Sequence, residues 1–117
     1  MTQTVLIVDD NQDSREVIGD ILSHHGLRVE MAISAEGALE LLTEGRFDLV
    51  VIDLRLPGMS GWELVQTIQA QAAIPCVAIT AYHNPQVTQE IHAAGFVAYF
   101  PKPLDERTFA QELRRFM

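Results

Sequence analysis

The sequence predicts an α/β protein in which helices cover both faces of a five-stranded parallel sheet, a single doubly wound (βα)5 domain. Two observations predict this class. Apolar segments typical of strands alternate with amphipathic segments typical of helices, five of each, along the chain. Most strand segments are continuous apolar runs, as expected for strands buried on both faces, and the links are short enough for right-handed crossovers.

The first two strand–helix units are delimited by glycine. Strand 5–8 is followed by a helix over about 14–25 that ends at Gly26, a residue favoured just after a helix. Strand 27–32 precedes a helix that begins after Ser34 and stops at Gly45. The apolar residues expected to face the sheet are Val17, Ile18, Ile21, Leu22, Ala38, Leu39 and Leu42.

The remaining three units carry clearer helix starts. Strand 49–52 is followed by a capping box of Ser60 and Glu63, and strand 76–80 by Asn84, which we expect to cap a helix ending at Gly95. Strand 97–100 precedes a last helix from Asp105. The side chains expected to face inward are Leu64, Val65, Ile68, Val87, Ile91, Ala94, Phe109, Leu113 and Phe116.

Length and composition limit the function. The 117 residues are enough for one domain, 1–117, and too few for two. A formal net charge of −8 argues against direct binding to nucleic acids or to anionic membrane surfaces, since both repel an acidic protein. No segment has the length of a membrane span and the N-terminus lacks the features of a signal peptide, so we expect a cytoplasmic protein.

Polar side chains end four of the five predicted strands. Asp9 and Asp10 follow the first strand, Asp53 the third, Thr80 ends the fourth and Lys102 follows the fifth. Ligands of doubly wound sheets bind outside the carboxyl ends of the strands, so we expect these side chains at one edge. A lone aspartate there is more often a helix cap, but three close carboxylates repel one another unless a cation neutralises them. Their hard oxygens suit Mg²⁺, with Mn²⁺ as the alternative.

This set of side chains is suited to phosphoryl chemistry. A metal ion and Lys102, the only lysine of the chain, would neutralise phosphoryl oxygens, and the Thr80 hydroxyl could donate a hydrogen bond to one of them. Asp53 is placed to be the nucleophile, because carboxylates can accept phosphate as an acyl phosphate. This reading explains why a buried apolar strand ends in a charge.

Four motifs in order resemble the receiver domain of two-component response regulators, over essentially the whole chain. They are "LIVDDN" with Asp9 and Asp10, "DLRLPGMSG" with Asp53, Pro57 and Gly61, "AITA" with Thr80 and Ala81, and "YFPKPL" with Tyr99, Lys102 and Pro103. The resemblance implies a flavodoxin-like sheet with strand order 2-1-3-4-5. It also implies a cis peptide bond between Lys102 and Pro103.

The resemblance further implies a mechanism. Asp53 would accept a phosphoryl group from a sensor histidine kinase or a histidine phosphotransfer protein. Asp10, Asp53 and the backbone carbonyl of Arg55 would ligate Mg²⁺, with Asp9 acting largely through water, and Lys102 would pair with the phosphoryl oxygens. The chain would be a signalling switch that catalyses only its own phosphorylation and slow dephosphorylation, and not an enzyme in the usual sense.

The same resemblance implies a response to phosphorylation. Thr80 would move toward the phosphoryl group and Tyr99 would follow it inward. This would change the face of the fourth helix, fifth strand and fifth helix, through which a downstream effector or a second copy would bind. The side chains of Arg55 and Tyr82 could overhang the site, and we hypothesise that their bulk slows hydrolysis of the acyl phosphate.

Three other readings stay open at this point. A small Mg²⁺-dependent phosphatase of the haloacid dehalogenase type would need an acid two residues after the nucleophile, where this chain has Arg55. A nucleotide-binding domain would need a G-x-G-x-x-G or P-loop motif after a strand, and the sequence has neither. A receiver that is no longer phosphorylated would act as a fixed interaction module. The chain could be a stand-alone regulator or one domain of a larger regulator or hybrid kinase.

Overall fold

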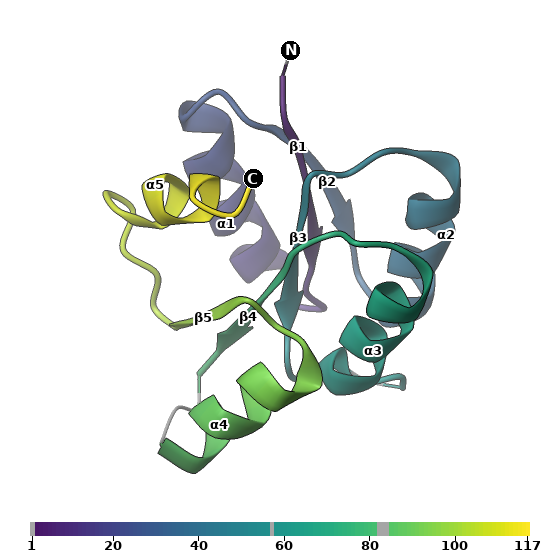
Figure 1. Cartoon of the computed structure of the whole chain (residues 1–117). Helices are drawn as coiled ribbons and strands as arrows, with labels where there is room; N and C mark the ends of the chain where they lie inside the picture. Colours follow the sequence, from purple (N-terminus) through teal and green to yellow (C-terminus); the bar gives the residue numbers. More distant parts are fainter. Residues whose placement is uncertain (1, 57, 82–84) are drawn as a thin grey trace.

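The computed structural model describes residues 2–56, 58–81 and 85–117. Its five strands form one parallel sheet in the order β2-β1-β3-β4-β5, which confirms the predicted fold and strand order (Figure 1). The expectations for Pro57, Tyr82 and Asn84 lie outside the described residues. The strands are β1 (Thr4–Val8), β2 (Arg28–Ala32), β3 (Leu49–Asp53), β4 (Cys76–Thr80) and β5 (Ala98–Pro101).

Helices follow the strands in strict alternation. Among the described residues, Asn11, Ser34 and Ser60 cap three of them, and each accepts a hydrogen bond from a backbone N–H in the first turn. None of the helices in the described part of the chain combines the length and apolar character needed to cross a membrane. The helices are α1 (Gln12–His24), α2 (Ala35–Glu44), α3 (Gly61–Gln71), α4 (Pro85–Ala94) and α5 (Phe109–Arg114).

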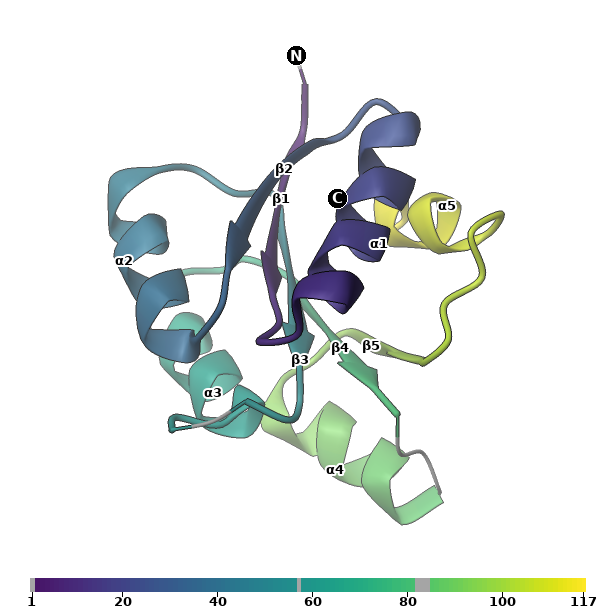
Figure 2. The ribbon, with the colours of Figure 1, turned by 180° about the vertical axis from the view of Figure 1, so that it is seen from behind.

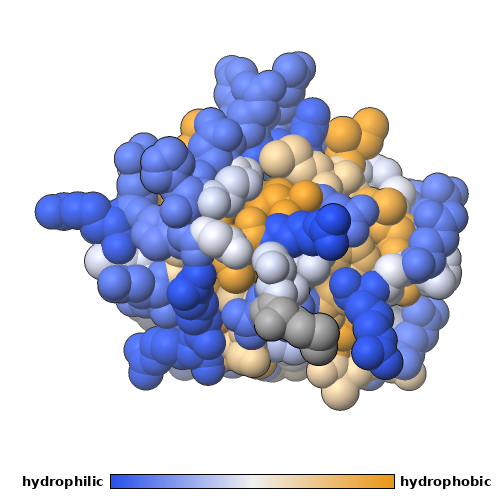
Figure 3. Space-filling view, turned by 90° about the horizontal axis from the view of Figure 1, so that it is seen from above, coloured by the Kyte–Doolittle hydropathy of each residue, from blue (hydrophilic) through white to orange (hydrophobic). Residues whose placement is uncertain are grey.

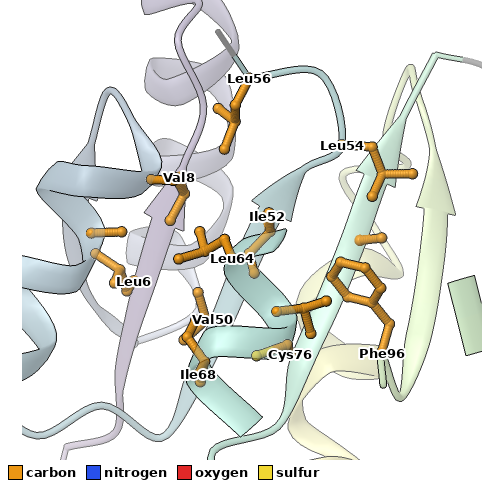
Figure 4. Close-up of a cluster of buried hydrophobic side chains, with 14 of the residues drawn as sticks. Leu6, Val8, Val50, Ile52, Leu54, Leu56, Leu64, Ile68, Cys76 and Phe96 are labelled. Atoms are coloured by element: carbon orange, nitrogen blue, oxygen red, sulfur yellow. The ribbon is translucent and has the colours of Figure 1, made fainter. Parts of the chain in front are cut away.

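The sheet separates two hydrophobic clusters. On one face α2, α3 and α4 pack against side chains such as Leu6, Val50 and Ile52, and Figure 4 shows how Leu64 and Ile68 of α3 reach this cluster. On the other face α1 and α5 cover the alternate residues of the same strands. The two ribbon views agree on this division, with α1 and α5 together on one side (Figures 1 and 2). Burial on both faces explains why the sequences of β1, β3 and β4 are nearly continuous apolar runs, whereas the edge strand β2 is largely exposed.

The start of the last helix and the exposure of Val17 differ from the sequence expectations. The last helix begins at Phe109 rather than Asp105: residues 106–108 form turns, and the carboxylate of Asp105 accepts a hydrogen bond from the Arg107 N–H. Val17 was expected to face the core, but it is 50% exposed. The other three residues expected to face the core, Ile18, Ile21 and Leu22, are buried. The face of α1 that packs on the sheet is therefore narrower than the expected stripe, and Val17 lies outside it.

The parallel strands bring their carboxyl ends to one edge of the sheet. All five strands run in the same direction, so the residues that follow β1, β3 and β5 gather at the same edge of the sheet. Figure 3 shows the opposite end, where the strands begin, with hydrophilic residues over much of the rim and hydrophobic residues toward the middle. The predicted site therefore lies at the carboxyl edge, as the sequence indicated.

Candidate functional site

Three aspartates meet at the carboxyl edge of the sheet. Asp9 follows β1 and is fully buried, Asp53 ends β3 and is 7% exposed, and Asp10 is exposed. One carboxylate oxygen of each lies within 4.8 Å of the others. Hard oxygens at this separation, with one open to solvent, match what a small divalent cation requires. The grouping predicted from the strand ends is thus present.

Lys102 lies between the two buried carboxylates. Its Nζ is 3.2 Å from Oδ2 of Asp9 and 3.3 Å from Oδ2 of Asp53. The backbone of Lys102 is held by a hydrogen bond from its N–H to the Thr80 carbonyl, 2.8 Å long, and the peptide bond to Pro103 is cis, as expected. The ammonium group therefore sits close to both carboxylates, with its side chain still 27% exposed.

Asp53 is a partly desolvated carboxylate with opposing influences on its charge. Burial raises its pKa above the usual value of 3.8, and the nearby charge of Asp9 adds to this effect. The Arg55 N–H, which donates to Oδ1 at 3.0 Å, and the Lys102 ammonium act in the opposite direction. The net effect is a raised pKa, so the folded protein holds this negative charge at a cost that a bound cation would offset.

Asp9 is held more completely than Asp53. Its Oδ1 accepts a hydrogen bond from the Asn11 N–H at 2.9 Å, and its Oδ2 accepts one from the Ser14 hydroxyl at 2.6 Å. Its backbone carbonyl accepts a hydrogen bond from the Arg15 guanidinium at 2.9 Å. The first turn of α1 therefore fixes both the side chain and the backbone of Asp9.

The sequence did not reveal these three supporting residues. We expected the helix to begin near Ser14, whereas it begins at Gln12 and Asn11 is its N-cap, with the Asn11 side chain accepting from the Ser14 N–H at 2.8 Å. A signal was present, because asparagine is one of the residues preferred at helix N-caps. The contact of Ser14 with Asp9 depends on how the helix turns back over the strand end, which the spacing alone does not give.

The other expected residues lie around this centre. Thr80 is buried at the end of β4, and Tyr99 is half-buried in β5, packed against the cluster that α2, α3 and α4 cover. The Arg55 side chain is exposed in the segment after β3. Gly61 lies at the start of α3, where an added Cβ would be 2.7 Å from the Asp53 carbonyl oxygen. The absence of a side chain there lets α3 approach the end of β3.

Comparison with known proteins agrees with this geometry. A family model described as "Response regulator receiver domain" matches residues 5–114. The chain is 40% identical to the sensor histidine kinase AruS of Pseudomonas aeruginosa over 116 residues, which are 95% of this chain and 11% of that protein. It is 28% identical to sporulation initiation phosphotransferase F of Bacillus subtilis, covering 100% of this chain and 95% of that protein.

A solved structure has the same fold. The chemotaxis protein CheY4 of Vibrio cholerae superposes with a TM-score of 0.93 at 29% sequence identity, with both chains covered completely. The chain thus spans a small part of some relatives and nearly the whole of others.

Proposed function

The chain belongs to the family of response regulator receiver domains, and on this premise we propose that Asp53 is the residue that accepts its phosphoryl group. Receiver domains are phosphorylation-dependent signalling switches that interact with histidine kinases or phosphotransfer proteins. One observation carries the assignment to Asp53. It is the carboxylate that ends the central strand β3 and shares the Lys102 ammonium with the fully buried Asp9.

We propose that the aspartates hold Mg²⁺, with Mn²⁺ as a substitute. Asp10, Asp53 and the backbone carbonyl of Arg55 are the proposed ligands, and Asp9 acts largely through water. The proposal is supported by the donor set, three carboxylates whose oxygens lie within 4.8 Å of one another. When bound, Mg²⁺ supplies positive charge for the phosphoryl oxygens in the transition state.

The side chains around Asp53 are suited to the transfer step. An oxygen of Asp53 attacks the phosphorus of a phosphohistidine, the O–P bond forms as the N–P bond breaks, and the imidazole leaves with a proton from solvent. The Arg55 N–H and Lys102 Nζ each contact one oxygen of Asp53 and so orient the carboxylate. Lys102 can then follow the developing charge onto the phosphoryl oxygens.

We also propose how the signal leaves the site. Thr80 moves toward the phosphoryl group and Tyr99 moves inward, which changes the surface of α4, β5 and α5 for an effector or a second copy of the chain. The pairing of β4 with β5 supports this coupling. Thr80 is the register partner of Pro101, and Tyr99 lies two residues before Pro101 in β5. The whole of 1–117 acts as the receiver unit, in the cytoplasm, where ATP-dependent histidine kinases carry their phosphoryl groups.

The experiment that tests the proposal follows the intact mass of the protein after incubation with acetyl phosphate and Mg²⁺. We expect one phosphoryl adduct in the wild type, none in Asp53→Asn and none when a chelator removes Mg²⁺. Asp20→Asn, which makes the same change at an exposed position of α1, should form the adduct like the wild type.

Other outcomes contradict the proposal in distinct ways. An adduct that persists in Asp53→Asn would place the acceptor elsewhere. No adduct from acetyl phosphate or from a phosphorylated histidine phosphotransfer protein would indicate a fixed interaction module. Rapid release of inorganic phosphate without an adduct would favour a phosphatase.

A further inference from the structure

The Asp9 carboxylate contacts three donors, and one of them is a serine hydroxyl. Oδ1 accepts from the Asn11 N–H at 2.9 Å, while Oδ2 is shared by the Ser14 hydroxyl at 2.6 Å and the Lys102 ammonium at 3.2 Å. The contact with Ser14 is the shortest of the three. Its length is that of a charge-assisted O–H···O⁻ hydrogen bond, which is about twice as strong as a neutral one.

Ser14 is not needed to cap α1. Serines in a first turn commonly accept a backbone N–H, but here Asn11 is the N-cap and accepts the N–H of Ser14 itself at 2.8 Å. The Ser14 hydroxyl is therefore available as a donor. The cap holds the backbone of Ser14, and its hydroxyl points back to the end of β1, where it donates to Asp9.

Ser14 and Lys102 use the same oxygen of Asp9. Lys102 has a second acceptor, Oδ2 of Asp53, at nearly the same distance, 3.3 Å against 3.2 Å. A buried carboxylate oxygen that lost the hydroxyl would depend on Lys102 alone and would draw the ammonium toward Asp9. The Ser14 hydroxyl therefore favours a position of Lys102 in which the ammonium group contacts the carboxylates of both Asp9 and Asp53.

We propose that Ser14 is a positioning residue, which orients the Asp9 carboxylate toward the metal and keeps Lys102 shared between Asp9 and Asp53. The inference deepens the proposed function and rests on it for the identity of the metal and of the transfer reaction. Side chains that hydrogen-bond metal-binding carboxylates typically change metal affinity or activity by about 10- to 100-fold when removed. Because Asp9 acts on the metal largely through water, we expect an effect for Ser14 at the low end of this range, about 10-fold.

The test compares Ser14→Ala, Ser14→Thr and Ser23→Ala with the wild type. Ser14→Thr keeps the hydroxyl, and Ser23→Ala makes the same change at an exposed position near the other end of α1. Isothermal titration with Mg²⁺ in the absence of any phosphodonor gives the metal affinity. We expect the dissociation constant for Mg²⁺ to be about 10-fold larger in Ser14→Ala than in the wild type, and close to the wild-type value in the other two variants.

A second readout follows Lys102 directly. Because the chain has one lysine, protein labelled with ¹³C-lysine gives a single side-chain Cε signal in NMR spectra. In metal-free protein this signal should move in Ser14→Ala and return to its wild-type position in Ser14→Thr. A general loosening of α1 would not be reversed by the hydroxyl of threonine, so the pair of variants separates positioning from stability.

The outcomes separate the inference from the proposed function. Unchanged Mg²⁺ affinity and an unchanged Lys102 signal in Ser14→Ala would overturn the inference, even where the wild type is phosphorylated normally. Equal losses in Ser14→Ala and Ser14→Thr would also overturn it, by showing that the hydroxyl is not responsible. A wild type that binds Mg²⁺ but forms no adduct would overturn the proposed function, while the affinities still decide the role of Ser14.

Discussion

At the scale of single residues, the two buried aspartates have different surroundings. Asp9 contacts three donors, from Asn11, Ser14 and Lys102, whereas the contacts of Asp53 are the Arg55 N–H and Lys102. Burial raises the pKa of Asp53 because these two contacts do not make up for the water that the carboxylate has lost. A weakly solvated carboxylate beside a cation is well placed to react with phosphorus.

This difference predicts a pH-dependent effect of Asp53→Asn. The folded pKa of Asp53 is raised above 3.8, so the favourable contribution of the protonated form is fully present below pH 3.8 and is lost as pH rises through the folded pKa. The side-chain amide introduced by Asp53→Asn does not titrate, so the variant does not lose stability in this way. Urea unfolding in the presence of a chelator should therefore show Asp53→Asn gaining stability relative to the wild type as the pH rises above 3.8.

The control for this prediction is Asp20→Asn, at an exposed position. Its free energy of unfolding relative to the wild type should change less over the same pH range. A difference between Asp53→Asn and the wild type that stays flat, or that shrinks as pH rises, would contradict the raised pKa.

At the scale of helices and strands, the start of α3 is packed directly on the end of β3. An added Cβ on Gly61 would be 2.7 Å from the Asp53 carbonyl oxygen and 3.0 Å from Cα of Leu54. Both neighbours are backbone atoms, which cannot turn aside as a side chain can. The position of the helix and the position of Asp53 are therefore linked.

We expect Gly61→Ala to lower the free energy of unfolding by about 1–3 kcal/mol, the usual cost of overpacking. It should also slow the formation of the phosphoryl adduct, because the end of β3 must shift. Urea unfolding and intact mass measure the two effects. Gly45→Ala is a matched control, since a Cβ there would meet its neighbours at 3.6 Å or more. Equal effects of the two substitutions would show that the close approach at Gly61 is unimportant.

At the scale of the whole molecule, the sheet shields its one thiol. Cys76 lies in β4 with no exposed surface, and burial raises the pKa of its thiol to about 11. At pH 8 only about one thiol in a thousand would be ionised. The folded protein should therefore be nearly inert to thiol reagents, which react with the thiolate.

This shielding predicts that labelling of Cys76 with a thiol reagent follows unfolding. Leu64→Ala, which removes a buried side chain of the same cluster, should destabilise the protein by about 2–5 kcal/mol and accelerate labelling. Labelling rates measured against urea concentration provide the test. Fast modification of the folded wild type, at a rate that urea does not change, would contradict the burial of the thiol.

The charge of the molecule gives a further prediction. A net charge of −8, with three carboxylates together at one edge, makes the metal-free protein sensitive to cations. Mg²⁺ at ten times its dissociation constant should add about 1.4 kcal/mol to the free energy of unfolding. The thermal midpoint should rise more with Mg²⁺ than with NaCl at equal ionic strength, and Asp10→Asn should reduce the difference. An equal rise with both salts would indicate screening alone.

Much of the fold and of the site was available in the sequence. Continuous apolar runs, helix-spaced stripes and capping residues such as Ser34 and Ser60 define local structure, because each acts over only a few residues. Parallel strands then bring whatever follows them to one edge, so Asp9, Asp53 and Lys102 could be grouped from their places along the chain. The strand order came from the family resemblance and not from the pattern itself.

Only the tertiary structure decided the finer arrangement. The exposure of Val17, the late start of α5 and the close approach at Gly61 depend on which neighbours cover each segment. The Asp9 carboxylate accepts hydrogen bonds from Ser14, 5 positions away in the sequence, and from Lys102, 93 positions away. The sequence by itself therefore determined which groups meet at the edge of the sheet, because that follows from local structure and parallel topology. Which donor each carboxylate oxygen accepts a hydrogen bond from depends on differences in distance of a few tenths of an ångström, and only the packing of the folded chain sets these distances.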